Sequence, residues 1–286
     1  MPGVSRPLRS PSTGSPTEGR LGHNGFVSEL KHPVRGAAPT VLPRLGWEVV
    51  VVLGISLGQS AVYAIVSIIE RLTRQVRLSQ QTSTLNQSVT PDRPWLDLTY
   101  QVLNIAFALV PVLLVLYLLR VRRPSARGIG FDLRRPRSDL LFGLVVAAGI
   151  GIPGLGLYLG ARALGINTQV QASALADNWW TVPVLILAAA QNAVLEEVVM
   201  IGYLFTRLRQ LRWRWVWIVL GSALVRGSYH LYQGFGGFVG NLIMGAIFGL
   251  IYLRFRRVGP LVVAHTVLDI VAFVGYALVA PHVSWL

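Results

Sequence analysis

Long apolar runs recur along the chain from Trp47 onward, and short polar segments separate them. A helix needs roughly 20 apolar residues to cross the hydrocarbon core of a bilayer, and most of these runs approach that length. The pattern therefore predicts an all-α fold, a polytopic integral membrane helix bundle of about seven transmembrane helices. The predicted spans are 47–69, 98–119, 140–161, 180–206, 216–232, 235–253 and 258–280.

The residues before the first run have a different composition. Residues 1–40 contain six Pro, six Gly and five Ser, and such a segment buries too little apolar surface to order itself. We therefore expect a disordered cytoplasmic tail over 1–44 and a membrane domain over 45–286. The whole chain is 53% hydrophobic and 13% charged, against about 25% charged in soluble proteins, which argues against a soluble domain.

The net charge of the chain is +14, from 26 Lys and Arg against 12 Asp and Glu. Because the basic residues stand in short clusters between apolar runs, we expect a lipid bilayer and no nucleic acid as partner. The loop 120–138 carries seven Arg, whereas the loop 164–179 carries none. By the positive-inside rule, this alternation predicts a multi-pass cell-membrane protein with a cytoplasmic N-terminus and an external C-terminus. The preference for Arg over Lys suggests a bacterial chain.

A few ionisable residues lie deep within the predicted spans, where each costs at least about 2.5–3.5 kcal/mol. All of them fall on the fourth, fifth and seventh spans. They are Glu196, Glu197, Arg226, His230, His265 and Asp269. Their confinement to three spans predicts one localised site, with Asn192 and Asn241 as possible lining residues of a polar cavity.

The spacing of these residues sharpens the prediction. Arg226 and His230 are four residues apart, as are His265 and Asp269, so each pair shares a helix face. The two glutamates are adjacent and point about 100° apart on a helix. One of them can therefore face a reaction centre while the other pairs sideways.

The motifs on these spans resemble those of the CPBP family of intramembrane proteases, which includes the type II CAAX prenyl endopeptidases and the bacterial Abi proteins. The string Glu196-Glu197-Val-Val-Met-Ile-Gly-Tyr-Leu resembles the family's EEhhFRGYL motif. His230 ends a segment that matches FxxxH, and His265 to Asp269 matches HxxxN or HxxxD. The resemblance covers about 180–275 and implies an intramembrane endopeptidase that cleaves a membrane-associated protein or peptide.

Two positions depart from the family motifs. Ile201 stands where the first motif has Arg, and Arg226 stands where the second motif has Phe. A buried Arg needs a carboxylate partner, and Glu197 would otherwise be unpaired. We therefore expect Arg226 to replace the lost counter-ion and to pair with Glu197 across helices.

Two chemical schemes fit the implied activity. In the first, Glu196 is the general base, His230 helps to hold the water, and His265 with Asp269 stabilises the oxyanion. An ionised Asp cannot donate to an oxyanion as the family's Asn can, so Asp269 is either protonated, an orienting group or a metal ligand. In the second, Glu196, His230 and His265 bind Zn²⁺. The chain has no Cys, and no Ser has a positioned base, so a covalent acyl route is not indicated.

Two other functions remain open at this stage. The missing motif Arg favours a catalytically inactive relative that acts as a membrane immunity or scaffold protein, and the Glu and His residues would also suit a proton-coupled transporter. Glu196 lies 11 residues from Arg207, and His265 lies eight from Arg257. These short separations predict a pocket that opens toward the Arg-rich, cytoplasmic end of the bundle.

Overall fold

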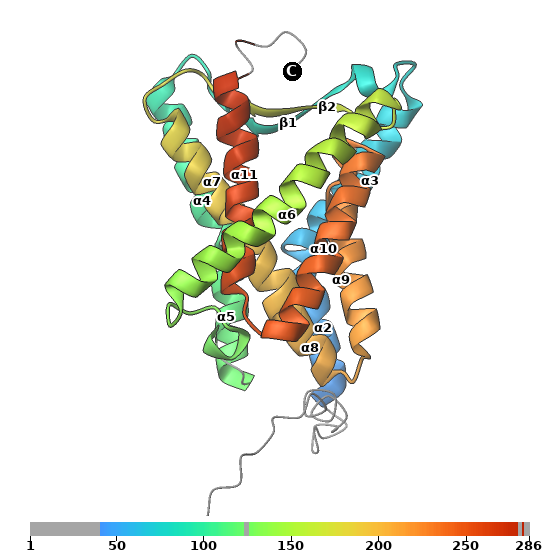
Figure 1. The fold of residues 1–286 in the computed structure, drawn as a ribbon, viewed down its shortest axis with the longest axis vertical. Helices are drawn as coiled ribbons and strands as arrows, with labels where there is room; N and C mark the ends of the chain where they lie inside the picture. The colour runs from blue at the N-terminus through green and yellow to red at the C-terminus, as the bar shows by residue number, and fades with distance from the viewer. Residues whose placement is uncertain (1–40, 123–125, 280–281, 283–286) are drawn as a thin grey trace, which may run out of the picture. The chain divides into compact units, whose positions relative to one another are not determined.

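The computed structural model describes residues 41–122, 126–279 and 282. Residues 1–40 of the expected tail lie outside the described part, and helix α2 begins at Val41. The described chain is a helix bundle (Figure 1), which confirms the predicted all-α membrane fold. Its α-helices are α2 (Val41–Gly54), α3 (Leu57–Thr73), α4 (Pro94–Ala108), α5 (Val110–Arg122), α6 (Pro136–Ala163), α7 (Thr181–Glu196), α8 (Leu204–Gln210), α9 (Trp215–Tyr229), α10 (Phe235–Phe255) and α11 (Gly259–Val279).

Shorter elements join these helices. One is a π-helical segment, η3 (Glu197–Tyr203), which continues α7 into α8. The 3₁₀ turns are η1 (Leu78–Gln80), η2 (Ala126–Ile129) and η4 (Leu231–Gln233), and the strands are β1 (Thr82–Gln87) and β2 (Gln169–Ala174).

Five helical stretches of the described chain are long and apolar enough to cross a membrane. They are Pro94–Val121, Pro136–Ala163, Thr181–Gln210, Phe235–Phe255 and Gly259–Leu278. The pair Arg44–Gly54 and Leu57–Thr73, bent by 54°, makes a sixth if it is one broken span. The predicted fifth span is shorter than expected, because α9 has only 15 residues. At 1.5 Å per residue, α9 covers about 22 Å of a core that is about 30 Å thick.

The reason for this short helix lies in the turn that follows it. After His230, the chain makes one 3₁₀ turn and reverses at Gly234, whose φ of +105° is open to Gly and strained for other residues. A Cβ at this position would stand 2.7 Å from the Cα of Asn167. The α9–α10 reversal therefore places His230 inside the protein rather than at a membrane surface.

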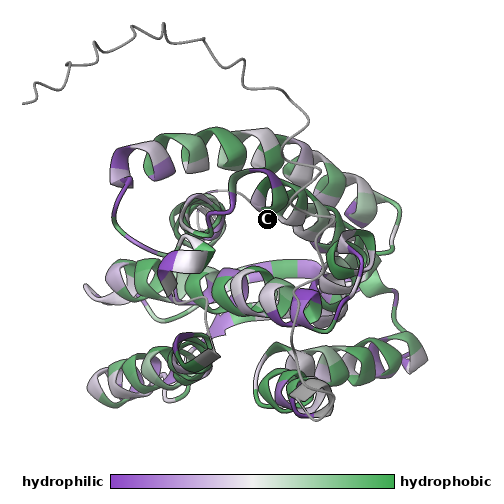
Figure 2. Ribbon diagram, turned by 90° about the horizontal axis from the view of Figure 1, so that it is seen from below, coloured by the Kyte–Doolittle hydropathy of each residue, from purple (hydrophilic) through white to green (hydrophobic). Residues whose placement is uncertain are grey.

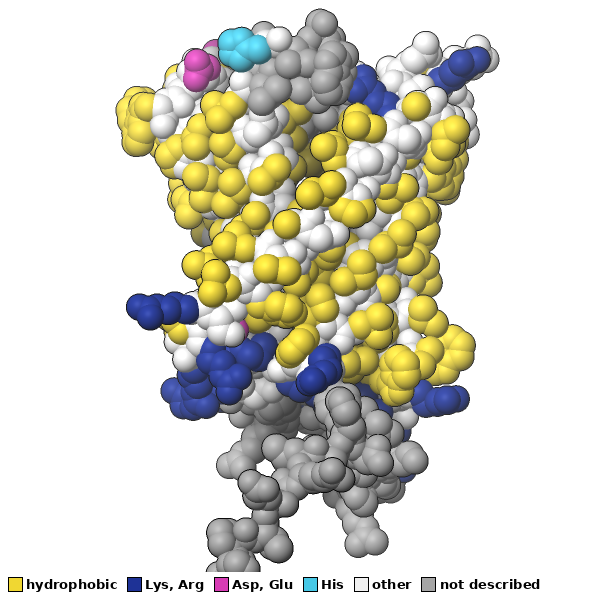
Figure 3. All heavy atoms as spheres, viewed as in Figure 1, with side chains coloured by type: hydrophobic (Ala, Val, Ile, Leu, Met, Phe, Trp, Pro, Cys, Tyr) yellow, Lys and Arg dark blue, Asp and Glu magenta, His cyan; other side chains and the backbone are white. Residues whose placement is uncertain are grey.

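The outer surface of the bundle fits a bilayer. Apolar side chains cover the flanks seen in Figure 3, and most Lys and Arg side chains in that view gather at the lower end. Seen from that end, hydrophobic stretches predominate along the outer helices (Figure 2). The Arg-rich loops expected on one side thus share one end of the molecule.

The two strands were not expected from the sequence. They pair in parallel, with Thr82 opposite Gln169 and Gln87 opposite Ala174, and cross the upper end of the bundle in Figure 1. Ser83 Oγ donates to the carbonyl of Tyr232 at 2.8 Å, which ties the strand pair to the α9–α10 turn. The loops 70–97 and 164–179 therefore form one ordered cover at the end opposite the Arg-rich loops.

An ion cluster at the Arg-rich end fixes the start of α11. Arg257 donates to Asp139 at 2.9 and 2.6 Å and to Asp132 at 3.2 Å. The N–H of Arg134 and the Arg257 guanidinium hold the pKa of the Asp132 carboxyl below its usual value. These bonds join the loop before α6 to the turn between α10 and α11, which sets the position of His265 two turns further on.

A second buried ion pair joins α2 to α8. Arg207 is fully buried, and its Nε donates to Glu48 Oε1 at 2.7 Å, while Tyr203 donates to the same oxygen at 3.1 Å. Replacing Glu48 with Gln leaves a buried guanidinium without a counter-charge. We predict that Glu48→Gln lowers the free energy of unfolding by about 3–5 kcal/mol, measured by denaturant unfolding in detergent micelles.

The matched control for this prediction is Glu70→Gln. Glu70 pairs with Arg74 on α3, and both side chains are more than half exposed, so this pair is worth at most about 1 kcal/mol. Equal losses of stability in the two variants would contradict the role assigned to Glu48.

Candidate active site

The six ionisable residues predicted to form a site do come together, on α7, η3, α9 and α11. Glu196 is the last residue of α7, and Glu197 opens the π-helical segment η3. A π-turn within an α-helix is rare and is frequent at functional sites. Here the π-helical segment begins at the second of the two adjacent carboxylates. Both carboxylates contact the same Arg on α9.

That residue is Arg226, which is 1% exposed. Its Nη2 donates to Glu196 Oε2 at 3.0 Å and to Glu197 Oε1, and its Nε lies 3.3 Å from Glu196 Oε2. The structure thus contains the expected Arg226–Glu197 pair. It adds a second pair with Glu196, because the guanidinium offers several donors in a planar fork.

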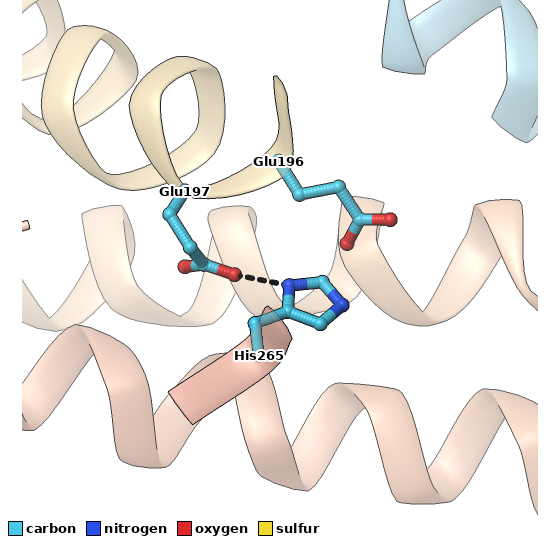
Figure 4. A group of neighbouring side chains, drawn as sticks. All are labelled: Glu196, Glu197 and His265. Carbon is cyan, nitrogen blue, oxygen red and sulfur yellow. Dashed lines mark hydrogen bonds and ion pairs between the residues drawn. The ribbon is translucent and has the colours of Figure 1, made fainter. Parts of the chain in front are cut away.

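His265 extends this cluster to α11. Its Nδ1 lies 2.8 Å from Glu197 Oε1, the bond drawn in Figure 4. Since an ionised carboxylate only accepts, we assign the proton of this bond to Nδ1. The other nitrogen, Nε2, lies 3.6 Å from Oδ1 of Asp269, one helical turn further along α11. His265 therefore stands between two carboxylates.

His230 lies on the other side of Glu196. Its Nε2 is 3.9 Å from Glu196 Oε1, beyond hydrogen-bonding distance, and it is buried without a partner among the described residues. Its Nδ1 lies 3.3 Å from Nε2 of Gln233. The His230 ring is thus held next to Glu196 with one nitrogen available.

Tyr229 is a site residue that the sequence analysis missed. Its hydroxyl donates to Glu196 Oε2 at 2.7 Å and lies 3.3 Å from Nε of Arg226. Tyr229 could not be recognised by charge within a predicted span, because a Tyr hydroxyl is neutral and common in membrane helices. Its position next to His230 in the sequence was the available signal.

A cavity of about 870 Å³ opens beside this cluster. Asn192 and Asn241 line it, as predicted, together with Glu196, His230, His265 and Asp269. Neither Glu197 nor Arg226 belongs to the lining. Within the described chain, Glu196 therefore faces the cavity while Glu197 and Arg226 lie behind it, in the arrangement that the adjacent carboxylates suggested.

The cavity does not open toward the Arg-rich end, so this expectation was wrong. Its lining continues to Leu85, Asn86 and Gln87 of β1 and to Val170 of β2. On the other side of Glu196, the residues of η3 are almost completely buried in the main hydrophobic core. The short sequence separations of Glu196 and His265 from the Arg clusters did not indicate the direction of the cavity, because η3 fills the space between the site and that end of the bundle.

The sequence left a zinc ion bound by Glu196, His230 and His265 open as one of two schemes, and it stays a prediction. Among the described residues, the donor atoms within 4.8 Å of one another belong to Glu196, Glu197 and His265, and His230 is not part of this group. Arg226 Nη2 contacts both carboxylates and lies 3.5 Å from Nδ1 of His265. Arg226 therefore already occupies one oxygen of each carboxylate, and a zinc ion bound to those oxygens would have to displace the guanidinium.

Comparison with known proteins agrees with the motifs. Residues 178–271 match the family described as Type II CAAX prenyl endopeptidase Rce1-like. The matched segment contains all six ionisable residues of the site as well as Tyr229. No curated protein and no solved structure gives a match to the chain.

The contacts of Arg226 with the two glutamates predict the relative free energies of unfolding of three variants. Arg226→Met leaves two buried carboxylates without a counter-charge, whereas Glu197→Gln leaves Arg226 with Glu196 as a partner. We predict a loss of about 3–5 kcal/mol for Arg226→Met and a smaller loss for Glu197→Gln, measured by denaturant unfolding in detergent. Adding Ile201→Arg to the Arg226→Met variant should recover part of the loss, since it restores the positive charge of the family motif.

The opposite order of stability, with Glu197→Gln costing more than Arg226→Met, would show that Glu197 has a partner more important than Arg226.

Proposed function

We propose that this protein is an intramembrane endopeptidase, because residues 178–271 match the family of Rce1-like type II CAAX prenyl endopeptidases. It hydrolyses a peptide bond in a membrane-associated protein or peptide. The observation that carries the proposal is a buried Glu that faces a cavity, with an Arg and a Tyr bonded to its carboxylate and two His residues on the same cavity wall.

Glu196 is the proposed general base. Its Oε2 accepts from Arg226 and Tyr229, which fix the carboxylate, and its Oε1 is directed toward His230. The gap of 3.9 Å between Oε1 and Nε2 of His230 lets one water lie about 2.8 Å from both atoms. This water is the nucleophile, and it would satisfy the nitrogen that is otherwise without a partner.

The reaction then follows the positions of the side chains. The water oxygen attacks the carbonyl carbon of the substrate as Glu196 takes its proton, and the carbonyl becomes a tetrahedral oxyanion. Glu196 returns the proton to the amide nitrogen, the C–N bond breaks, and the acyl product passes its remaining water proton to the amine, so that a carboxylate and an ammonium group leave. The donors for the oxyanion are the side-chain amide of Asn192 and Nε2 of His265, both on the cavity wall. For Nε2 to donate while Nδ1 donates to Glu197, the His265 ring is doubly protonated, with Glu197 and Asp269 as its counter-charges.

Glu197 and Asp269 are positioning residues in this scheme. Glu197 accepts from Nδ1 of His265 and thereby sets the ring orientation, while Asp269 lies beside Nε2. Asp269 therefore orients His265, which is one of the roles left open for it by the sequence. Arg226 balances the charge of the two glutamates, so that Glu196 can remain ionised in a buried place.

Removing the base should abolish cleavage without unfolding the protein. We predict that Glu196→Gln lowers the rate of hydrolysis by about 10²–10⁴-fold, because Gln keeps the shape of Glu but cannot take a proton. The measurement is cleavage of a mixture of peptides, each with an apolar anchor, in lipid vesicles, with products identified by mass spectrometry. Glu70→Gln, an exposed change on α3, is the control and should cleave like the wild type.

Cleavage by Glu196→Gln at the wild-type rate would refute the role of Glu196. A wild-type protein that binds these peptides and cleaves none would favour the alternative of an inactive family relative.

The place of Arg226 also predicts the response to metal removal. Because the Arg226 guanidinium already supplies the counter-charge of Glu196 and Glu197, we expect the rate of peptide cleavage to be the same before and after treatment with a strong zinc chelator. A loss of activity that added Zn²⁺ restores would contradict the metal-free scheme.

A further inference from the structure

The cavity has a second chemical feature besides the ionisable cluster, and the two adjoin at Asn192 and Gln233. Eight Asn and Gln side chains line it, and no Lys or Arg does so within the described chain. They are Asn86, Gln87, Gln101, Asn104, Gln191, Asn192, Gln233 and Asn241, and we call the part of the cavity that they line the amide cleft. A surface of this kind offers hydrogen-bond donors and acceptors in equal measure and carries no net charge.

Two of these amides stand at the same depth without a partner. Asn104 lies ten residues after Pro94, and Gln191 lies ten residues after Thr181, so each is about 15 Å along its membrane span. Neither side chain forms a hydrogen bond with another described residue; Asn104 is exposed and Gln191 is half-buried. Polar side chains at this depth of a membrane bundle face a polar cavity rather than lipid, and these two present free donors and acceptors to whatever the cleft binds.

The strand β1 borders the same cleft. Side chains alternate between the two faces of a strand, yet three consecutive residues of β1, Leu85 to Gln87, line the cavity. The end of β1 therefore borders the cavity with side chains from both of its faces, beside Val170 of β2. In the described chain β1 has one strand neighbour, β2, so the other edge is not paired with a strand and can accept an added strand.

We propose that the amide cleft binds the substrate segment next to the scissile bond as an extended, uncharged peptide aligned with the edge of β1. This inference rests on the proposed protease function and names the form in which that substrate binds. Only an extended backbone needs the amides, because a helix satisfies its own N–H and C=O groups and a lipid chain has none.

The dimensions of the cleft agree with this occupant. On α7, Asn192 is one turn and Ala188 two turns from Glu196, and both line the cavity. Two turns cover about 12 Å, which is the length of about four residues of an extended strand. The cleft would thus hold some four residues on the β1 side of the bond that Glu196 attacks.

Cross-linking tests the position of this peptide without turnover. Each protein variant carries Glu196→Gln and one cysteine, and the chain has no other. The probe is the anchored-peptide mixture used for cleavage, with one cysteine beside the anchor, in phosphatidylcholine vesicles. We expect disulfide formation with Asn104→Cys and Gln191→Cys and little with the controls Phe107→Cys and Leu187→Cys, which are exposed on the same helices outside the cleft.

Kinetics give a second measurement in the active protein. Asn104→Leu and Gln191→Leu each remove one hydrogen-bonding group, so KM should rise about three- to tenfold while kcat stays the same. Asn104→Gln should recover part of the loss, because it keeps the amide.

The outcomes separate the two proposals. Peptide cleavage with equal cross-linking at all four positions and an unchanged KM would overturn the extended-peptide cleft and leave the protease intact. Preferential cross-linking without cleavage by the wild type would instead overturn the protease and retain the peptide-binding cleft.

Discussion

The contact of Arg226 with Glu196 and Glu197 is the interaction on which the rest of the site depends. A guanidinium and two carboxylates are all but withdrawn from solvent on three neighbouring elements, and each would be costly there alone. Their mutual attraction draws η3 and α9 together, and the bond from Glu197 to His265 adds α11. The cluster thus ties together α7, α9 and α11, each of which contributes side chains to the cavity wall, and it adds charge interactions to the apolar packing of η3.

This arrangement also sets the direction in which the cavity extends. The π-helical segment that follows Glu196 is packed into the core, so the polar space lies on the side of β1 and β2. The strand pair is tied to the α9–α10 turn, and that turn carries His230. A cover of loop residues and a reactive cluster in the membrane are therefore parts of one unit, which suits the proposed hydrolysis of a peptide that enters from the bilayer.

Much of the site could be predicted from the sequence because charge in a membrane is expensive and therefore rare. Glu196, His230, His265 and Asp269 were identified in this way, and the structure brings them to one cavity. The same argument cannot detect neutral groups, so Tyr229 was missed. The two strands were not predicted, because short polar loops lack the long apolar runs from which the helices were predicted. Their pairing also joins segments more than 80 residues apart. The short α9 depends on the reversal at Gly234, which an apolar run does not reveal.

The most direct test of the central claim is chemical rescue of a protein that lacks the Glu196 carboxylate. In Glu196→Ala, Arg226 and Tyr229 keep their donors beside the space left by the side chain, so a small carboxylate can bind there. Peptide cleavage by this variant should be absent in sodium chloride and should return, in a concentration-dependent manner, in sodium formate at equal ionic strength. Cleavage by Glu196→Ala without formate, or no return of cleavage in a variant that still binds peptide, would contradict the account.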